Sequence, residues 1–103
     1  MISFTWNQSK NLSNQRKHGV SFEEASTVFL DQCSLLFDDP DHSDDEDRFN
    51  IIGISTNLRL CVVCHCYRNN DDEIRIISAR VATISEQSIY NKYSRVGGYE
   101  NER

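Results

Sequence analysis

The sequence predicts one α+β domain in which an antiparallel β-sheet carries two N-terminal helices and one C-terminal helix. The length of 103 residues is typical of one domain and is enough to bury about two-thirds of the unfolded surface. Hydrophobic periods of two and of 3.6 residues follow one another in the order β-α-α-β-β-β-β-α. We expect the domain to span residues 1–96 and a flexible tail to follow at 97–103, after the two adjacent glycines.

The N-terminal part is expected to form a strand and two helices. Apolar and polar residues alternate over 2–6, which favours a short strand. Asn7 is a favourable N-cap for a polar, basic helix over 7–17, and Gly19 suits the left-handed residue after its end. The second helix, over 21–31, begins with the spacing of a capping box.

Four strands and a helix are expected to complete the domain. The strands are predicted at 34–37, 49–54, 58–67 and 73–81. A capping-box pair opens the last helix at residue 83, and we expect this helix to end before the two glycines. Strands that follow one another through short turns favour hairpins, so the predicted sheet is antiparallel.

Acidic residues are concentrated in one segment of the chain. The net charge is −5, which by itself argues against a nucleic-acid binder. Seven acidic residues lie within 38–47, however, and the rest of the chain has 11 basic and 9 acidic residues. We interpret the segment as a solvated loop. The alternative of a calcium loop is disfavoured because the glycine and terminal glutamate of an EF-hand are missing.

The four cysteines do not predict a metal centre. Cys61, Cys64 and Cys66 lie on one predicted strand, where Cys61 faces away from the other two. Together with Cys33 they are expected to remain thiols in a reducing compartment. The N-terminus lacks the pattern of a signal peptide and no apolar stretch is long enough to span a membrane, so we expect a cytoplasmic protein.

Basic and imidazole side chains are the candidate functional residues. They could be purely structural, because cations in the last turn of a helix stabilise its dipole. They could also cleave RNA without a metal, since attack by the ribose 2′-hydroxyl needs a base, an acid and cations around the phosphate. The candidates are Arg16, Lys17, His18, Arg48, Arg59, His65, Arg68, Arg75 and Arg80.

Strand geometry limits how two of these arginines can act together. Arg75 and Arg80 are five positions apart, so a regular strand places them on opposite faces. A bulge between them, action of Arg80 from the end of the strand, or a site with only one of them would each resolve the conflict.

The sequence resembles the BrnT toxins of bacterial BrnT–BrnA toxin–antitoxin systems. The family's opening Phe-x-Trp-Asp is similar to Phe4-Thr5-Trp6-Asn7, with Asn7 in place of aspartate. The cysteines of the long strand and Asn69, which stands where a glycine is usual, are further departures. The other matching segments are 16–25, 38–43, 46–48, 75–80 and 82–83.

The resemblance implies a RelE-like fold and a ribonuclease that inhibits translation and growth, with no cofactor and no metal. It also implies a BrnA-type antitoxin, a dimeric ribbon-helix-helix protein that forms a heterotetramer with the toxin and contacts operator DNA. Carried over by position, the catalytic residues are Lys17, His18, Arg48, Arg75 and Arg80, with His18 or Lys17 transferring protons. The weaker candidates for substrate binding are Arg16, His65, Tyr67 and Arg68.

Two other functions remain open at this stage. The acidic loop and the negative net charge would suit a non-catalytic binding module that acts as corepressor with a DNA-binding antitoxin. The cysteine-rich strand leaves a metal-binding or redox domain as a third hypothesis, which metal analysis of the purified protein would test.

Overall fold

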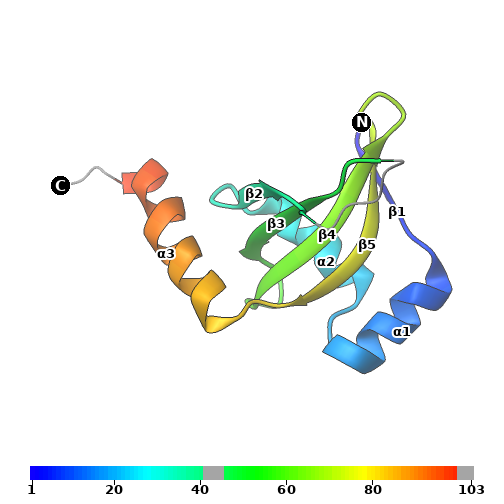
Figure 1. Cartoon of the computed structure of the whole chain (residues 1–103), viewed down its shortest axis with the longest axis horizontal. Helices are drawn as coiled ribbons and strands as arrows, with labels where there is room; N and C mark the ends of the chain where they lie inside the picture. The colour runs from blue at the N-terminus through cyan, green and yellow to red at the C-terminus, as the bar shows by residue number, and fades with distance from the viewer. Residues whose placement is uncertain (41–45, 100–103) are drawn as a thin grey trace.

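A computed structural model describes residues 1–40 and 46–99, and this part of the chain forms a five-stranded sheet with helices on both sides (Figure 1). The predicted α+β class and the predicted order of elements are confirmed. The elements are β1 (Ser3–Thr5), α1 (Gln8–His18), α2 (Phe22–Thr27), a 3₁₀ turn η1 (Val28–Leu30), β2 (Leu35–Asp38), β3 (Phe49–Ile54), β4 (Leu60–Arg68), β5 (Glu73–Val81) and α3 (Ile84–Tyr99).

The sheet is mixed, which corrects the prediction of an antiparallel sheet. Its strand order is β1-β5-β4-β3-β2, and β2 to β5 pair antiparallel in succession as expected. The strand β1 instead lies parallel to β5, with Ser3 opposite Glu73 and Thr5 opposite Arg75. Apolar alternation specifies which face of β1 is buried but not which strand it joins. The chain between β1 and β5 supplies the long connection that parallel pairing requires.

Two apolar clusters hold the helices against the sheet. The larger cluster lies between the sheet and α2 with η1, and its members are Val20, Phe22, Ala25, Val28, Ile51, Cys61, Val63, Ile76 and Ala79. The smaller cluster lies on the opposite face and includes Tyr90 of α3 with Ile52, Val62 and Ala82. The sheet therefore has a face covered by α2 and a face partly covered by α3 (Figure 1).

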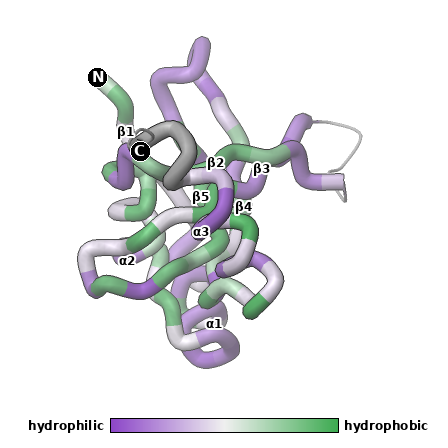
Figure 2. Tube along the Cα trace, turned by 90° about the vertical axis from the view of Figure 1, so that its left-hand side faces the viewer, coloured by the Kyte–Doolittle hydropathy of each residue, from purple (hydrophilic) through white to green (hydrophobic). Residues whose placement is uncertain are grey.

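The helix α1 is attached by polar contacts rather than by an apolar stripe. Figure 2 shows it as mostly hydrophilic, and its one leucine, Leu12, is 46% exposed. Asn14 is buried instead, and its amide donates to the carbonyl oxygens of Val20 and Ala79, both at 2.8 Å. The amide oxygen of Asn14 also accepts from the Ala79 backbone N–H at 3.2 Å. Asn14 thus pairs with the edge of β5 as a neighbouring strand would.

Helix ends follow local capping chemistry. Asn7 caps α1, Gly19 ends it with a φ of 73°, and Thr83 and Glu86 form the capping box of α3 as expected. Ser21 caps α2, but the carboxylate of Glu24 binds Ser55 and Arg59 instead of returning to the cap. The helix α3 continues through both glycines to Tyr99, past the predicted end. The last four residues of the predicted tail lie outside the described part of the chain.

Candidate functional site

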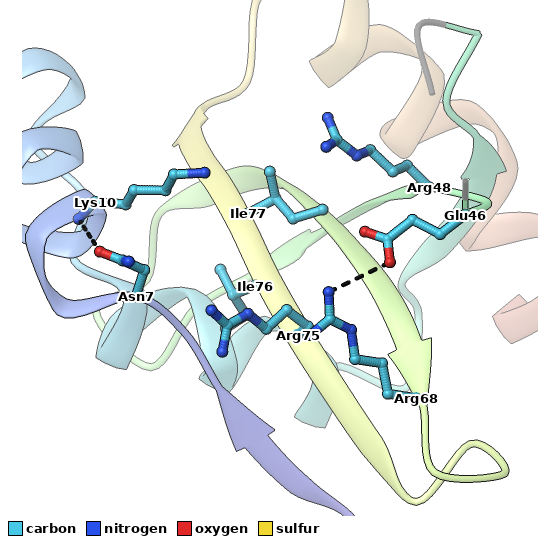
Figure 3. Close-up of a pocket in the computed structure, with 8 residues that line it drawn as sticks. All are labelled: Asn7, Lys10, Glu46, Arg48, Arg68, Arg75, Ile76 and Ile77. Carbon is cyan, nitrogen blue, oxygen red and sulfur yellow. Dashed lines mark hydrogen bonds and ion pairs between the residues drawn. The ribbon is translucent and has the colours of Figure 1, made fainter. Parts of the chain in front are cut away.

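A cationic pocket lies on the α3-facing side of the sheet, beside β5. It has a volume of about 200 Å³ and draws its lining from α1, from the segment before β3, and from β4 and β5 (Figure 3). Four of the lining residues are cationic and one is acidic. The lining is Asn7, Lys10, Glu46, Arg48, Arg68, Arg75, Ile76 and Ile77, and we refer to this set as the cationic pocket.

A β-bulge places Arg75 in the pocket. The register between β4 and β5 shifts where Cys64 faces Ser78 and the next residue, His65, faces Ile76. Ile77 is therefore an extra residue on β5, and the alternation of its side chains reverses there. Arg75 and Arg80 consequently project from the same face, so the structure selects the bulge among the possibilities left open by the sequence.

Lys10 was not predicted from the sequence as a site residue. The Asn7 side chain accepts from the backbone N–H of Lys10 at 3.1 Å, which fixes the first turn of α1. Because β1 pairs with β5 as far as Arg75, the helix that follows begins beside that arginine. In Figure 3 the Lys10 side chain extends over β5 toward Ile77. The sequence does not reveal this position of Lys10, because it depends on the parallel pairing of β1 with β5.

Glu46 and two arginines form the opposite wall of the pocket. Arg48 precedes β3, and its backbone carbonyl accepts from Asp39 at 2.9 Å. Arg68 ends β4 and donates to the Glu46 carboxylate at 3.3 Å. The thiol of Cys66 lies 3.5 Å from the same carboxylate, and burial raises the pKa of this thiol, which keeps it protonated. Like Lys10, Glu46 is a charged lining residue that the sequence did not predict as part of the site.

Two of the pocket's cations, and one nitrogen of a third, have no hydrogen-bond partner among the described residues. No hydrogen bond or ion pair joins the guanidinium of Arg75 or the ammonium of Lys10 to another side chain of the described residues. The Nε atom of Arg48 is buried and is likewise without a hydrogen bond in this part of the chain. Unpaired donors on cationic groups favour an anion with several oxygens, such as a phosphate. The pocket can therefore bind a phosphodiester, and Glu46 is its one lining group that can accept a proton as a carboxylate.

The remaining predicted cations lie outside the lining of this pocket. Arg16, Lys17 and His18 are exposed in the last turn of α1, one turn beyond Asn14 and its contact with Ala79. Arg80 donates to both carboxylate oxygens of Glu86, at 2.7 and 2.8 Å. The predicted set therefore divides between the Arg75 end and the Arg80 end of β5.

His65 is a core residue. Its ring is fully buried, and its centroid is 4.8 Å from that of Phe29 and 5.2 Å from that of Tyr67. Burial lowers the pKa of His65, so the neutral imidazole is favoured. Its Nε2 atom lies 3.2 Å from the Tyr67 hydroxyl. Because no surface of His65 is exposed, this side chain cannot contact a substrate in this structure. Tyr67, the other aromatic candidate for substrate binding, packs against His65.

The cysteines of β4 face opposite sides of the sheet, as predicted. Cys61 lies in the larger apolar cluster, whereas Cys64 and Cys66 contact Asp39 and Glu46 on the other side. Burial raises the pKa of Cys64 to about 12. Within residues 1–40 and 46–99 there is no group of His, Cys, Asp or Glu side chains suited to a metal ion. The calcium-loop alternative falls largely on residues 41–45, outside the described part.

None of the helices described has the length and apolar character to cross a bilayer.

A search of curated protein sequences finds no match. Among solved structures, the crystal structure of the Brucella abortus ribonuclease toxin BrnT matches with a TM-score of 0.61 and 22% identity. The match covers 81% of this chain and 99% of that one, and it shows a shared fold.

The family of BrnT ribonuclease toxins of type II toxin–antitoxin systems has a sequence profile that matches residues 6–86, which include the whole cationic pocket. This match spans most of the chain and agrees with the shared fold. The chain therefore belongs to the BrnT family of ribonuclease toxins of type II toxin–antitoxin systems.

Proposed function

We propose that this toxin is an endoribonuclease that holds a phosphodiester of RNA in the cationic pocket and cleaves it by metal-independent acid–base catalysis. The observation that supports this most directly is the convergence of Lys10, Arg48 and Arg75 in one hollow, where among the described residues the Lys10 ammonium, the Arg75 guanidinium and the Nε atom of Arg48 have no hydrogen-bond partner. The ribose 2′-oxygen would form a bond to phosphorus as the bond to the 5′-oxygen breaks. This leaves a 2′,3′-cyclic phosphate and a 5′-hydroxyl.

The cations of the pocket would stabilise the charge that develops on the phosphate. Preorganised donors are most effective where water is partly excluded and where they need no reorganisation during the reaction. Arg75 and Arg48 can each offer paired N–H donors to phosphate oxygens, and Lys10 can add a point charge. Glu46 is placed among them and would accept the proton of the attacking 2′-hydroxyl.

The residues at the far end of β5 would contact the RNA beyond the scissile phosphate. Lys17 and His18 are exposed on α1, and α1 runs alongside β5 from the pocket toward Arg80. RNA that follows this route would pass them after leaving the pocket. Proton transfer by His18 or Lys17, which the family resemblance implies, then requires the leaving 5′-oxygen to point toward the Arg80 end.

Neutralisation would come from a BrnA-type antitoxin. A type II toxin has a protein antitoxin, and the family resemblance implies a dimeric ribbon-helix-helix protein, a heterotetrameric complex and repression of the operon through the antitoxin. Both proteins would act in the cytoplasm, where RNA and ribosomes are accessible.

The decisive experiment compares purified variants on a defined RNA in the presence of EDTA. We expect the wild-type protein to produce 2′,3′-cyclic phosphate ends. Arg75→Ala and Glu46→Gln should each reduce the rate by about 10²–10³-fold, since each removes charge stabilisation or proton transfer. His18→Ala tests the proton donor to the leaving 5′-oxygen, a role proposed for His18 or Lys17. Lys92→Ala on α3 is the matched control because this exposed lysine lies outside the pocket.

Intact RNA with wild-type protein, with and without ribosomes, would contradict the proposal. Operator binding with the antitoxin under the same conditions would then favour the corepressor alternative. A loss of cleavage in His18→Ala but not in Arg75→Ala would move the active centre to the Arg80 end of β5.

A further inference from the structure

We propose that the antitoxin docks as an extended, apolar segment with flanking basic residues, which adds to the outer edge of β2 and fills the groove between β2 and α3. This inference rests on the proposed function, because it takes the antitoxin as the occupant. The groove is lined by Leu35, Leu36, Phe37, Ile89 and Tyr93, and we call this set the β2–α3 groove.

The outer edge of β2 offers backbone groups that no described strand satisfies. β2 is the last strand of the sheet and pairs only with β3. The bond from Asp39 N–H to the Arg48 carbonyl fixes which residues of β2 point toward β3. Since antiparallel bonding alternates along a strand, the N–H and C=O groups of Leu36 and Asp38 point outward. An extended chain can bind there by strand addition.

The groove beside this edge is apolar and accessible. Its volume is about 510 Å³. Leu36 is 53% exposed, Phe37 42% and Tyr93 55%. Natural sheets usually shorten, charge or cover an exposed apolar edge, because such an edge is otherwise prone to pair with another chain. The apolar side chains of an added strand would remove this surface from water.

Acidic residues at one end of the groove indicate the charge of the partner. Asp38 closes β2, and Asp39 and Asp47 lie next to it around a smaller pocket. A second copy of this acidic toxin would bring like charge to the same place, whereas Lys or Arg residues of another protein would find the complementary carboxylates of Asp38 and Asp47. A basic, apolar segment therefore fits this surface better than a homodimer does.

The direction of β2 leads toward the cationic pocket. The smaller pocket beyond Asp38 includes Arg48, which also lines the cationic pocket. An antitoxin segment that runs along β2 and continues past Asp38 would reach Arg48. One continuous antitoxin segment could thus both dock at the edge of β2 and cover the cationic pocket.

One wall of the groove follows the residues that the family profile matches. The family profile ends at residue 86, whereas Ile89 and Tyr93 follow on α3. Because these two side chains line the β2–α3 groove and not the cationic pocket, we expect them to contribute to recognition of the cognate antitoxin rather than to the chemistry on RNA.

The test measures binding of the purified BrnA-type antitoxin of the same operon to toxin variants. Tyr93→Lys should weaken binding at least tenfold because it places a cation in the apolar groove. Ile84→Lys is the matched control, since Ile84 is 81% exposed on the same helix but does not line the groove. The free variants should keep wild-type RNA cleavage, which separates a docking defect from an inactive toxin.

A second pair of variants isolates the backbone contact. Leu36→Ala removes the side chain but keeps the outward N–H, whereas Leu36→Pro removes the N–H as well without breaking a bond to β3. We expect Leu36→Pro to bind the antitoxin more weakly than Leu36→Ala, with circular dichroism confirming that both are folded. Equal binding by this pair, or unchanged affinity in Tyr93→Lys, would overturn the inference whether or not the toxin cleaves RNA.

Discussion

Single residues whose role is local follow directly from the sequence. Asn7, Gly19 and Thr83 act at helix ends as expected, because capping depends on neighbours three or four positions away. Asn14 could not be predicted as a buried contact, since its partner Ala79 is distant in the sequence. For His65 the sequence left open a structural role or a contact with substrate, and the structure places its side chain in the core.

Leu58 is the clearest case of local strain. Its φ is 63° and its side chain is 85% exposed, so it adopts a left-handed conformation without gaining burial. Such a conformation costs a residue with a β-carbon about 1–2 kcal/mol, and asparagine tolerates it better. We expect Leu58→Asn to raise the free energy of unfolding by about 0.5–1 kcal/mol in urea denaturation. Leu58→Ala is the control, and an equal gain in both variants would show that strain is not the cause.

At the scale of elements, the sequence predicts well which helices and strands are present, but it predicts less well which strands pair with each other. The bounds of β3 and β5 are as predicted, because each is an apolar run bounded by polar turn residues. The sequence did not determine the partner of β1 or the bulge in β5, since both arise from contacts between distant segments. The way α1 attaches to the sheet could not be predicted either, because polar side chains rather than an apolar stripe hold this helix in place.

Asn14 holds α1 against β5, so its loss should affect the whole domain. In Asn14→Ala the Ala79 N–H and C=O groups lose their partners in a buried setting. Leaving such groups unsatisfied costs about 1–3 kcal/mol each, and we expect a total loss of about 2–4 kcal/mol in the free energy of unfolding. Gln15→Ala, an exposed neighbour on α1, should change it little. Similar stability of the two variants would contradict this role.

The Arg80–Glu86 ion pair joins the end of β5 to α3 and should make stability depend on pH. Hydrogen bonds from Arg80 lower the pKa of Glu86 from 4.5 to about 2. The pair therefore stabilises the fold above about pH 4.5, and this contribution is lost as the pH falls toward 2. Thermal unfolding across this range should show a smaller loss for Glu86→Gln than for the wild type. Parallel pH profiles for the two proteins would refute this link.

At the scale of the whole molecule, the candidate site was predicted in part. Arg48, Arg68 and Arg75 were identified from their charge and family positions, and the cationic pocket contains all three. Lys10 and Glu46 were missed because their contribution depends on how β1 and the segment before β3 lie against β5. Lys17 and His18 were grouped with Arg75 by sequence motif, whereas the structure places them toward the other end of β5.

Our central claim is that the cationic pocket binds the RNA backbone although the net charge of the chain is −5. The pocket has four cationic side chains and one carboxylate, Glu46, in its lining, so positive charge is in local excess there. A binding site of this kind should be sensitive to salt, because each neutralised phosphate releases counterions.

The most direct test is binding of a 2′-O-methyl RNA, which lacks the attacking hydroxyl, measured at several salt concentrations. For single strands, the plot of log affinity against log salt has a slope of about −0.7 per neutralised phosphate. We predict that Arg75→Ala binds more weakly and has a shallower slope than the wild type, while Lys92→Ala retains both values. Equal affinity and slope for Arg75→Ala and the wild type would contradict the claim that this pocket holds the phosphate.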